Sequence, residues 1–324
     1  MILFPPRLCA SVARGGGILV LGFDMPSSDP VFPRIAIVGL GLIGGSIAFG
    51  ARRAWPSTHV IALDREPVIR EALSRRAIDA AADDLASVAD ADLIVLAAPV
   101  RQNLALLRRI AGHASSSAVI TDVGGTKRTI VAAAAALPQA VTFVGGHPLG
   151  GGARGGFEFA TASLFARRPW IFTPPDGYER VDAARSSPAG ATREAVSRLS
   201  AFVTGLGALP TTMTAAEHDR LMALISHLPQ LAATALMEVV GAAAASGGLR
   251  MAGQGLVDTT RLASSPADVW RDICVTNADE ISNALDLLIE RLSEMRSDLQ
   301  RAEVIDAVFN DAARWRAELM KGRD

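Results

Sequence analysis

The chain has 324 residues, of which 50% are hydrophobic and 5% aromatic, and its formal net charge is −1. This length supports two domains with real cores, and the balanced charge provides no basic surface for a nucleic-acid backbone, so we expect a small-molecule partner. Cys9 and Cys274 are too few and too far apart for a disulfide framework or a cysteine metal site, which favours a reduced, cytoplasmic protein.

Residues 1–33 are predicted to be a disordered N-terminal extension. The apolar run at residues 18–23 is short, follows three glycines and lacks the arrangement of a signal peptide. Met25 is an alternative start, and Arg7 with Arg14 leaves an organellar transit peptide as another alternative. No later segment is expected to span a membrane.

A glycine-rich turn after the first predicted strand is the most informative motif. Residues 35–38 form a β-branched run typical of a buried strand, and Gly39, Gly41 and Gly44 follow with the spacing G-x-G-x-x-G. Gly39 is expected to make the turn, Gly41 to admit a pyrophosphate, and Gly44 to let strand and helix pack closely. The motif predicts a dinucleotide site, and a purely structural turn is the alternative.

The residues around this turn refine the nucleotide prediction. A helical pattern follows at residues 43–53. Backbone N–H groups at its start, at Leu42 and Ile43, are expected to attract phosphate. A second strand at residues 59–63 ends at Asp64, whose carboxylate is placed to bind a ribose 2′-hydroxyl and to repel a 2′-phosphate. The adjacent Arg65 could instead pair with that phosphate. We therefore predict NAD, with NADP as the alternative.

Strand and helix patterns alternate as far as residue 174. Further strands are predicted at residues 92–99, 118–122, 141–144 and 169–174, with helices between most of them, as at residues 67–77 and 103–113. This alternation predicts a parallel sheet with right-handed crossovers. Ligands bind such sheets at the carboxyl ends of the strands, which here carry Ala98, Pro99, Asp122 and His147. Residues 34–174 are thus predicted to be a Rossmann-type domain.

The rest of the chain has no strand pattern. Residues 175–190 read as a linker, and helices are predicted at residues 191–205, 214–245, 267–298 and 302–319. The last two of these helices carry long apolar stripes that the short connections between the helices cannot cover. We therefore expect the stripes to be buried against a second copy of the chain, in a homodimer. The predicted fold class is α/β, with a Rossmann-type, mostly parallel sheet domain followed by an all-helical substrate and dimerisation domain at residues 191–324.

His147 is the only histidine placed where chemistry is expected. It lies in the run 145–148, directly after a predicted strand, with glycines that should leave its ring accessible. A histidine can take a proton while a hydride leaves, because its ordinary pKa lies near working pH. From the residues alone, a structural histidine in a glycine loop is an equal alternative.

Several motifs occur in the order and spacing of one enzyme family. They lie at residues 39–46 (GLGLIGGS), 122–127 (DVGGTK), 145–148 (GGHP), 226–229 (SHLP), 260–263 (TRLA) and 270–273 (WRDI). From about residue 34 to about residue 300, the chain resembles the prephenate/arogenate dehydrogenase family. The resemblance implies a tyrosine-biosynthesis enzyme that oxidises prephenate or arogenate with NAD(P) while the ring loses carbon dioxide and becomes aromatic.

The resemblance also implies roles for single residues. His147 would hold the ring hydroxyl and draw off its proton, and Arg261 would bind a substrate carboxylate through its planar fork. Trp270 would approach the site from the neighbouring subunit, unless it is a core aromatic. His227 is expected to have a packing role, and Lys127 to contact phosphate or to cap local structure. The other predicted substrate positions are Gly125, Thr126, Ser226 and Gln230.

The sequence departs from the family pattern at three positions. Gly125 stands where the family usually has serine, Ala153 where it has an acid, and Gln230 where relatives often have histidine. These departures leave open a related dehydrogenase of another small carboxylic acid, and a non-catalytic dinucleotide sensor. The C-terminus leaves no room for a regulatory domain of the ACT type, so tyrosine feedback is expected to be competitive.

Overall fold

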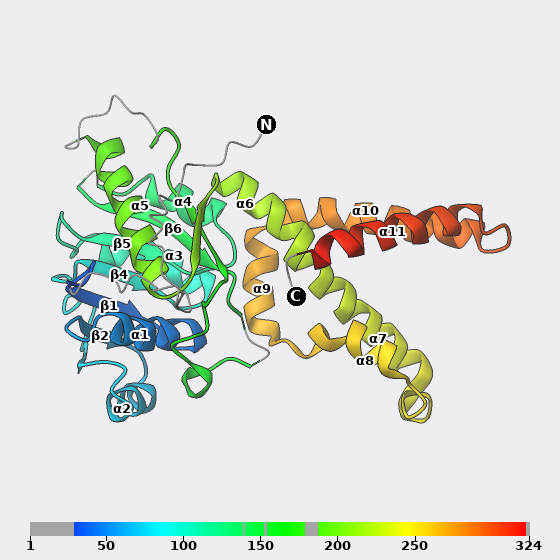
Figure 1. Cartoon of the computed structure of the whole chain (residues 1–324), viewed down its shortest axis with the longest axis horizontal. Coiled ribbons are helices and arrows are strands. Elements are labelled where there is room, and N and C mark those ends of the chain that lie inside the picture. Colours follow the sequence, from blue (N-terminus) through cyan, green and yellow to red (C-terminus); the bar gives the residue numbers. More distant parts are fainter. Residues whose placement is uncertain (1–28, 139, 152–153, 179–186, 322–324) are drawn as a thin grey trace, which may run out of the picture.

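The structure is a computed structural model that describes residues 29–138, 140–151, 154–178 and 187–321. An eight-stranded sheet with flanking helices forms one half, and helices alone form an elongated second half that projects from it (Figure 1). Residues 1–28 of the predicted N-terminal extension lie outside the described residues. Ala153 lies outside them as well.

The sheet has the strand order β3-β2-β1-β4-β5-β6-β7-β8. All neighbouring strands pair in parallel except β6 and β7, which are antiparallel. The prediction of a Rossmann-type, mostly parallel sheet is therefore confirmed. The strands are β1 (Arg34–Val38), β2 (His59–Leu63), β3 (Ala80–Ala81), β4 (Leu93–Leu96), β5 (Val119–Asp122), β6 (Thr142–Pro148), β7 (Pro169–Thr173) and β8 (Leu209–Thr212).

Helices cover both faces of the sheet, and its central strands are continuous apolar runs, as burial on both faces requires. Alternate residues along β1 enter different cores: Ile35 and Ile37 pack on one face, Ala36 and Val38 on the other. Side chains of α1 (Leu42–Ala54), α2 (Glu66–Ser74) and α5 (Pro188–Gly205) join the first core. Those of α3 (Val100–Ile110) and α4 (Arg128–Ala134) join the second.

The expectation that strands end before residue 191 is wrong. The strand β8 pairs in parallel with β7, and α5 packs against β6, β8 and α1. The sequence signal of β8 is weak because its four residues are exposed and include Pro210, which an edge strand tolerates. We therefore propose a domain boundary near residue 213, in place of the linker predicted at residues 175–190.

The helical half is confirmed, but two of its predicted helices are interrupted. The segment predicted at residues 214–245 divides around a π-helical turn, and that at residues 267–298 breaks at Asn277. In order, the elements are α6 (Ala215–Met222), the π turn η2 (Ala223–His227), α7 (Leu228–Leu249), α8 (Gln254–Thr259), the 3-10 turn η3 (Arg261–Ser264), α9 (Ala267–Thr276), α10 (Ala278–Asp298) and α11 (Glu303–Met320).

The two interruptions have different causes. Pro229 lies in the first turn of α7, where it lacks the N–H that a continuous α-helical ladder requires. Asn277 has φ −136°, and its buried amide donates to the Asp219 carbonyl and to His227 Nδ1. Both interruptions lie beside the sheet half and bring polar side chains to the junction.

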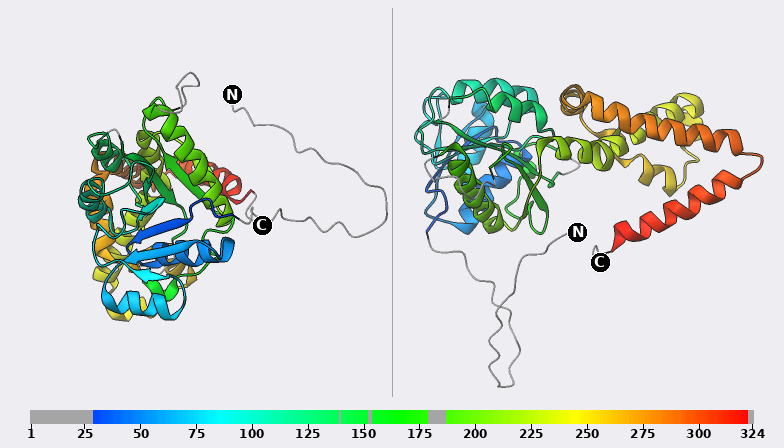
Figure 2. Two further views of the ribbon diagram at one scale, coloured as in Figure 1. Left: turned by 90° about the vertical axis from the view of Figure 1, so that its left-hand side faces the viewer. Right: turned by 90° about the horizontal axis from the view of Figure 1, so that it is seen from above.

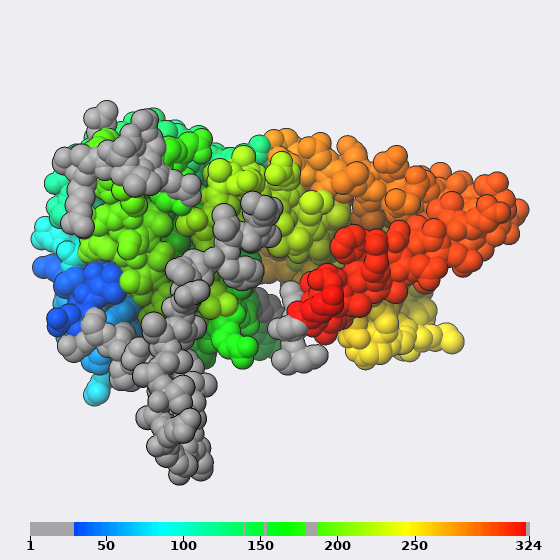
Figure 3. All heavy atoms as spheres, turned by 45° about the horizontal axis from the view of Figure 1, so that its top comes forward, coloured from blue at the N-terminus to red at the C-terminus, as the bar shows by residue number. Residues whose placement is uncertain are grey.

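The outer helices bury little of their apolar surface. The hairpin of α10 and α11 extends away from the sheet (Figures 1 and 2), and α11 has no buried residue. In the space-filling view α11 runs along the open face of the projecting half (Figure 3). Exposed large apolar side chains include Leu236 and Val239 on α7, Leu287, Ile289 and Leu292 on α10, and Phe309, Trp315 and Leu319 on α11.

One further property of this half differs from the sequence expectation. The helical segment Ala215–Leu249, which includes the π turn, is long and apolar enough to cross a membrane by length and composition, and its most apolar window has a mean hydropathy of 1.4. Only 11% of its most apolar window is buried. Length and composition alone are weak evidence for a membrane span, because helices that pack against other protein surfaces pass the same test.

Candidate active site

The glycine-rich turn forms a cradle between β1 and α1. Gly39 has φ +101°, and a Cβ atom there would lie 2.7 Å from the Ala97 carbonyl carbon. A Cβ on Gly44 would lie 2.0 Å from the Gly39 oxygen, so only glycine permits this packing. Around Gly41, by contrast, a Cβ would meet nothing within 4 Å. The backbone at Gly41 therefore faces open space, as the close approach of a pyrophosphate requires.

The start of α1 fits the same group. Its N-cap is Gly41, which provides no side-chain cap, so the N–H groups of Leu42 and Ile43 stay available to an anion. Ala98 and Pro99 lie beside the cradle at the carboxyl end of β4, where Pro99 is the N-cap of α3. Contact of Leu42, Ile43, Ala98 and Pro99 with the cofactor stays a prediction.

Asp64 closes the cradle on the β2 side. Its Oδ2 accepts a hydrogen bond from the backbone N–H of Leu40 at 2.6 Å, and its Oδ1 accepts one from Arg65. A recess of about 290 Å³ opens here, and Asp64, Glu71 and Glu158 line it. The Arg65 side chain is 86% exposed. Three carboxylates around one recess disfavour a further phosphate group there.

Asp122 has a different role from the one predicted. It is 1% exposed, and it accepts hydrogen bonds from the backbone N–H groups of Gly124 and Gly146, at 2.8 and 3.2 Å. Lys127 Nζ, also fully buried, lies 2.5 Å from its Oδ2 and donates to the Gly146 carbonyl. Asp122 therefore holds the ends of β5 and β6 together instead of binding cofactor, and Lys127 has no access to phosphate.

His147 lies within β6, opposite Ile171 of β7, and not in a loop after the strand as expected. Gly145 and Gly146 serve close packing instead of ring accessibility, because Cβ atoms there would lie 2.4 Å from Thr173 Oγ1 and 2.6 Å from the Asp122 oxygen. The half-buried ring of His147 is nevertheless partly accessible at the carboxyl edge of the sheet.

Two residues that sequence reasoning missed lie directly behind His147. Its Nδ1 is 2.8 Å from His218 Nε2, and His218 Nδ1 is 2.8 Å from Asp219 Oδ1. Both His218 and Asp219, from α6, are 0% exposed. The adjacent His-Asp pair in the sequence was the only available signal, and its position in an otherwise ordinary helix concealed it.

The surroundings keep His147 neutral at pH 7. Burial, followed by the neighbouring His218 and Lys127, lowers the pKa of His147 well below its usual 6.5. Burial likewise lowers the pKa of His218, although Asp219 opposes this shift. A neutral imidazole with an unprotonated nitrogen can accept a proton, which is the chemistry expected of this residue.

The helix α9 brings the helical half against this edge of the sheet. A Cβ on Gly125 would lie 3.7 Å from Ile273 Cδ1 of α9 and 3.9 Å from His147 Nε2, so Gly125 lies between them. Thr126 is buried, and its hydroxyl is 2.8 Å from the hydroxyl of Thr276. Thr126 thus ties the loop after β5 to α9, whereas Gly125 leaves space beside the imidazole.

Arg128 joins the two halves on the other side of the same loop. It forms an ion pair with Asp279 and a second one, at 3.3 Å, with the buried Asp219. Its Nη2 also donates to Asn277 Oδ1 at 2.9 Å. The hydrogen bond from Arg128 is the main cause that lowers the pKa of Asp279 to about 2.

His227 and Trp270 contact each other within one chain, with ring centroids 6.0 Å apart and nearly perpendicular. His227 is 2% exposed, which agrees with its expected packing role, and burial lowers its pKa to about 4. Trp270 is half-buried against a small apolar cluster that includes Ile273. Within one chain Trp270 is thus a partly buried aromatic, and its approach to the site from a neighbouring subunit stays a prediction.

Gln230 contacts the 3-10 turn η3, which carries Arg261, and the residue that follows it. Its amide nitrogen donates to the Leu262 carbonyl at 2.7 Å, and its oxygen accepts from the Ser265 hydroxyl at 3.0 Å. Because this amide is engaged on both sides, Gln230 holds η3 in place, and its predicted contact with substrate stays a prediction. Arg261, on η3, is exposed, and Ser226 lies half-buried in the π turn. The convergence of Arg261 and His147 on one substrate stays a prediction.

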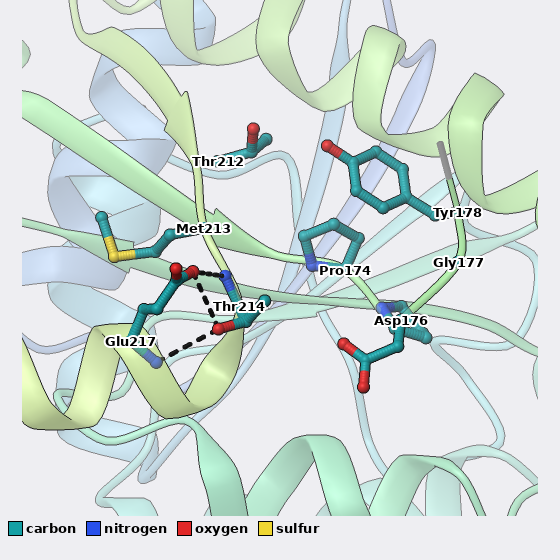
Figure 4. A pocket seen from close by; sticks show the side chains of 9 residues that line it. Pro174, Asp176, Gly177, Tyr178, Thr212, Met213, Thr214 and Glu217 are labelled. Carbon is teal, nitrogen blue, oxygen red and sulfur yellow. Dashed lines mark hydrogen bonds between the residues drawn. The ribbon is translucent and has the colours of Figure 1, made fainter. Parts of the chain in front are cut away.

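A separate hollow lies away from His147. It has a volume of about 530 Å³ and opens beyond the end of β7, at the start of α6 (Figure 4). The Glu217 carboxylate there accepts hydrogen bonds from the backbone N–H and hydroxyl of Thr214 in a capping box. This hollow contains no predicted site residue. The described residues also contain no group of three or more side chains that could hold a metal ion.

Together, the Rossmann-type sheet, the glycine cradle and a neutral histidine at the carboxyl edge define a nicotinamide-nucleotide-dependent dehydrogenase. Two family models match the chain: "Prephenate dehydrogenase, nucleotide-binding domain" at residues 47–189 and "Prephenate dehydrogenase, dimerization domain" at residues 214–309.

Curated relatives and solved structures agree with these models. The prephenate dehydrogenase of Bacillus subtilis (strain 168) is 33% identical over 87% of this chain and 75% of its own length. The cyclohexadienyl dehydrogenase of Zymomonas mobilis is 30% identical over 91% of this chain and 98% of its own length. A structure of A. aeolicus prephenate dehydrogenase with hydroxyphenyl propionate and NAD+ superimposes with a TM-score of 0.77, at 26% identity, over 88% of this chain and 98% of that chain. The chain belongs to the prephenate dehydrogenase family.

Proposed function

We propose that this chain catalyses the NAD-dependent oxidative decarboxylation of prephenate to 4-hydroxyphenylpyruvate, or of arogenate to tyrosine, in tyrosine biosynthesis. The observation that carries the proposal is the neutral, partly accessible His147 at the carboxyl edge of a nucleotide-binding sheet, against the helical half. The similarity to the Bacillus and Zymomonas dehydrogenases supports it.

In this proposal His147 binds the ring hydroxyl of the substrate, and Arg261 binds a carboxylate. His147 Nε2 accepts the ring hydroxyl proton while a hydride leaves the same carbon, and returns that proton to the phenolate oxygen once carbon dioxide has left. When bound, the nicotinamide supplies the acceptor for the hydride. Arg261 is exposed, and its guanidinium is available to bind a carboxylate in two-point fashion. Aromatisation drives the reaction, so the protein mainly orients the ring.

NAD is the proposed cofactor, with NADP as the weaker alternative. The recess beside the cradle places Asp64, Glu71 and Glu158 around the site expected for the adenosine ribose. A 2′-phosphate there would meet three carboxylates and one largely exposed arginine, Arg65. Asp64→Ala is therefore expected to raise the kcat/KM ratio of NADP to NAD by about tenfold, with Asp83→Ala as the surface control. If the kcat/KM ratio of NADP to NAD is unchanged in Asp64→Ala, residues other than Asp64 determine nucleotide selectivity.

The chain is proposed to act as a cytoplasmic homodimer. The exposed apolar side chains of α7, α10 and α11 form a surface that a second copy can cover, and the dimerisation-domain model includes α7, α10 and the start of α11. Burial in a dimer interface would also explain why the segment Ala215–Leu249 is apolar yet little buried in one chain, so that no membrane is needed. Cys274 is a free thiol, as expected in a reducing compartment. A monomeric mass by light scattering at assay concentration would contradict the dimer.

A related dehydrogenase of another small carboxylic acid is the second candidate. It is favoured by the absence of a side chain at Gly125 beside His147 and by the engaged amide of Gln230, two positions where the sequence departs from the family pattern. The discriminating experiment measures turnover of prephenate, arogenate and a panel of other small hydroxy acids with NAD and NADP. The main proposal requires the highest kcat/KM for prephenate or arogenate, with release of carbon dioxide. Turnover of another acid alone would establish the second candidate.

A further inference from the structure

Three side chains from the two halves of the molecule form a hydrogen-bonded line. His147 comes from β6 of the sheet, and His218 and Asp219 come from α6 of the helical half. His147 Nδ1 lies 2.8 Å from His218 Nε2, and His218 Nδ1 lies 2.8 Å from Asp219 Oδ1. Only His147, at one end, is partly accessible, whereas the other two are fully buried. The line therefore runs from an open reaction site into the protein.

The protons along this line can be placed from its buried end. Asp219 Oδ1 accepts from the backbone N–H of Lys127 at 2.7 Å, and Oδ2 accepts from that of Arg128 at 2.9 Å. Burial opposes ionisation, but hydrogen bonds from His218, Arg128 and Lys127 outweigh it and lower the pKa of Asp219. An ionised carboxylate can only accept, so His218 carries its proton on Nδ1.

The same reasoning fixes the proton on His147. A neutral His218 with a proton on Nδ1 has an unprotonated Nε2, which must accept the hydrogen bond from His147. His147 therefore donates from Nδ1, and its own Nε2 has no proton. This Nε2 faces the space at Gly125, where a built Cβ would lie 3.9 Å away. The bare nitrogen is the one that a substrate hydroxyl could reach.

We infer that His218 and Asp219 are positioning residues that hold His147 in its Nδ1–H tautomer and so keep Nε2 free as the base. The inference rests on the proposed function, because it assigns these residues to the same reaction. It also gives the helical half a direct part in the chemistry, since α6 sets the tautomer of a residue in the sheet. Asp219 further ties α6 to the loop that carries Gly125, through the N–H groups of Lys127 and Arg128.

The first test reads the tautomer without any turnover. In protein labelled with 15N at its five histidines, the long-range proton–nitrogen spectrum distinguishes Nδ1–H from Nε2–H rings. The His147 signals are assigned by their loss in His147→Asn. The inference requires a proton on Nδ1 and a bare Nε2 in the resting wild-type enzyme. A proton on His147 Nε2 would overturn it, whichever acid the enzyme oxidises.

The second test uses a matched pair of substitutions at one position. In His218→Gln, the amide oxygen replaces Nε2 as an acceptor for His147, whereas His218→Leu removes the acceptor. We expect His218→Leu to lower kcat by at least about tenfold, with KM changed less than about twofold, and His218→Gln to recover most of kcat. His113→Gln, at an exposed histidine, is the control.

The outcomes separate the inference from the proposed function. Equal kcat losses in His218→Gln and His218→Leu, with both variants folded by circular dichroism, would overturn the positioning role. If His218→Leu does not fold, the wild-type tautomer alone decides. If the tautomer is Nδ1–H but neither prephenate nor arogenate is turned over, the proposed function fails while the hydrogen-bonded line stands.

Discussion

Acid sensitivity provides a quantitative test of the buried histidines at the domain junction. Burial lowers the pKa of His227 from 6.5 to about 4. The unfolded chain therefore binds a proton near pH 6.5 that the folded chain binds only near pH 4, so stability is present above this window and is lost as the pH falls through it. At 1.36 kcal/mol per pKa unit, the gap corresponds to about 3 kcal/mol.

His147 and His218 also have lowered pKa values and act in the same direction below pH 6.5. The carboxylates affect stability in a separate, lower pH range. Asp279 has a pKa of about 2 in the folded chain, so its contribution is lost only below its ordinary value of 3.8. Loss of stability between pH 6.5 and about 4.5 thus reports on the histidines.

The assay is urea unfolding at a series of pH values. In His227→Asn the amide oxygen replaces Nδ1 as the acceptor opposite Asn277 Nδ2, which lies 3.3 Å away in the wild type. We expect this variant to lose about 2 kcal/mol less than the wild type between pH 6.5 and pH 5. The exposed His113→Asn control should follow the wild type. Identical pH slopes for wild type and His227→Asn would refute the reasoning.

Two further substitutions test the contacts around the loop after β5. Gly125→Ser adds a hydroxyl beside His147 Nε2, in a space where the built Cβ makes only ordinary contacts. One added hydrogen bond of about 1 kcal/mol should raise kcat/KM about fivefold, and a fall in kcat/KM would show that the space is needed for the substrate. Arg128→Met removes the pairs with Asp219 and Asp279, and should lower the free energy of unfolding by about 1–3 kcal/mol. Arg291→Met, which breaks only a surface pair with Glu294, should change it by less than about 0.5 kcal/mol, and equal effects would remove the special role of Arg128.

The sheet was predictable because its information is local. The β-branched runs, the glycine spacing and Asp64 each report on neighbouring residues, so the first two strands and the cradle follow from the sequence. The strand β8 was missed because an exposed edge strand carries no apolar run. Likewise, the break at Asn277 has no glycine or proline signal, since its cause is a set of contacts to residues distant in the chain.

The site was predictable only in part, for the same reason. His147 could be found because it follows a strand at a glycine motif, but its partners His218 and Asp219 are separated from it by about seventy residues of sequence. The role of Asp122 was misassigned because its position at a strand end does not reveal the buried Lys127 that engages it. The hydrogen bonds of Gln230 with Leu262 and Ser265 could not be predicted either, because these partners lie more than thirty residues away in the chain.

The most direct test of the central claim, that His147 is the base of a hydride-transfer reaction, is a single-turnover measurement. Excess enzyme with bound NAD is mixed with the better of the two acids, and NADH absorbance is followed in wild type and His147→Asn. The account predicts one NADH per substrate molecule in the wild type, and a rate lower by about 10²–10⁴-fold in the variant, with unchanged NAD affinity. An equal rate in both proteins would contradict it.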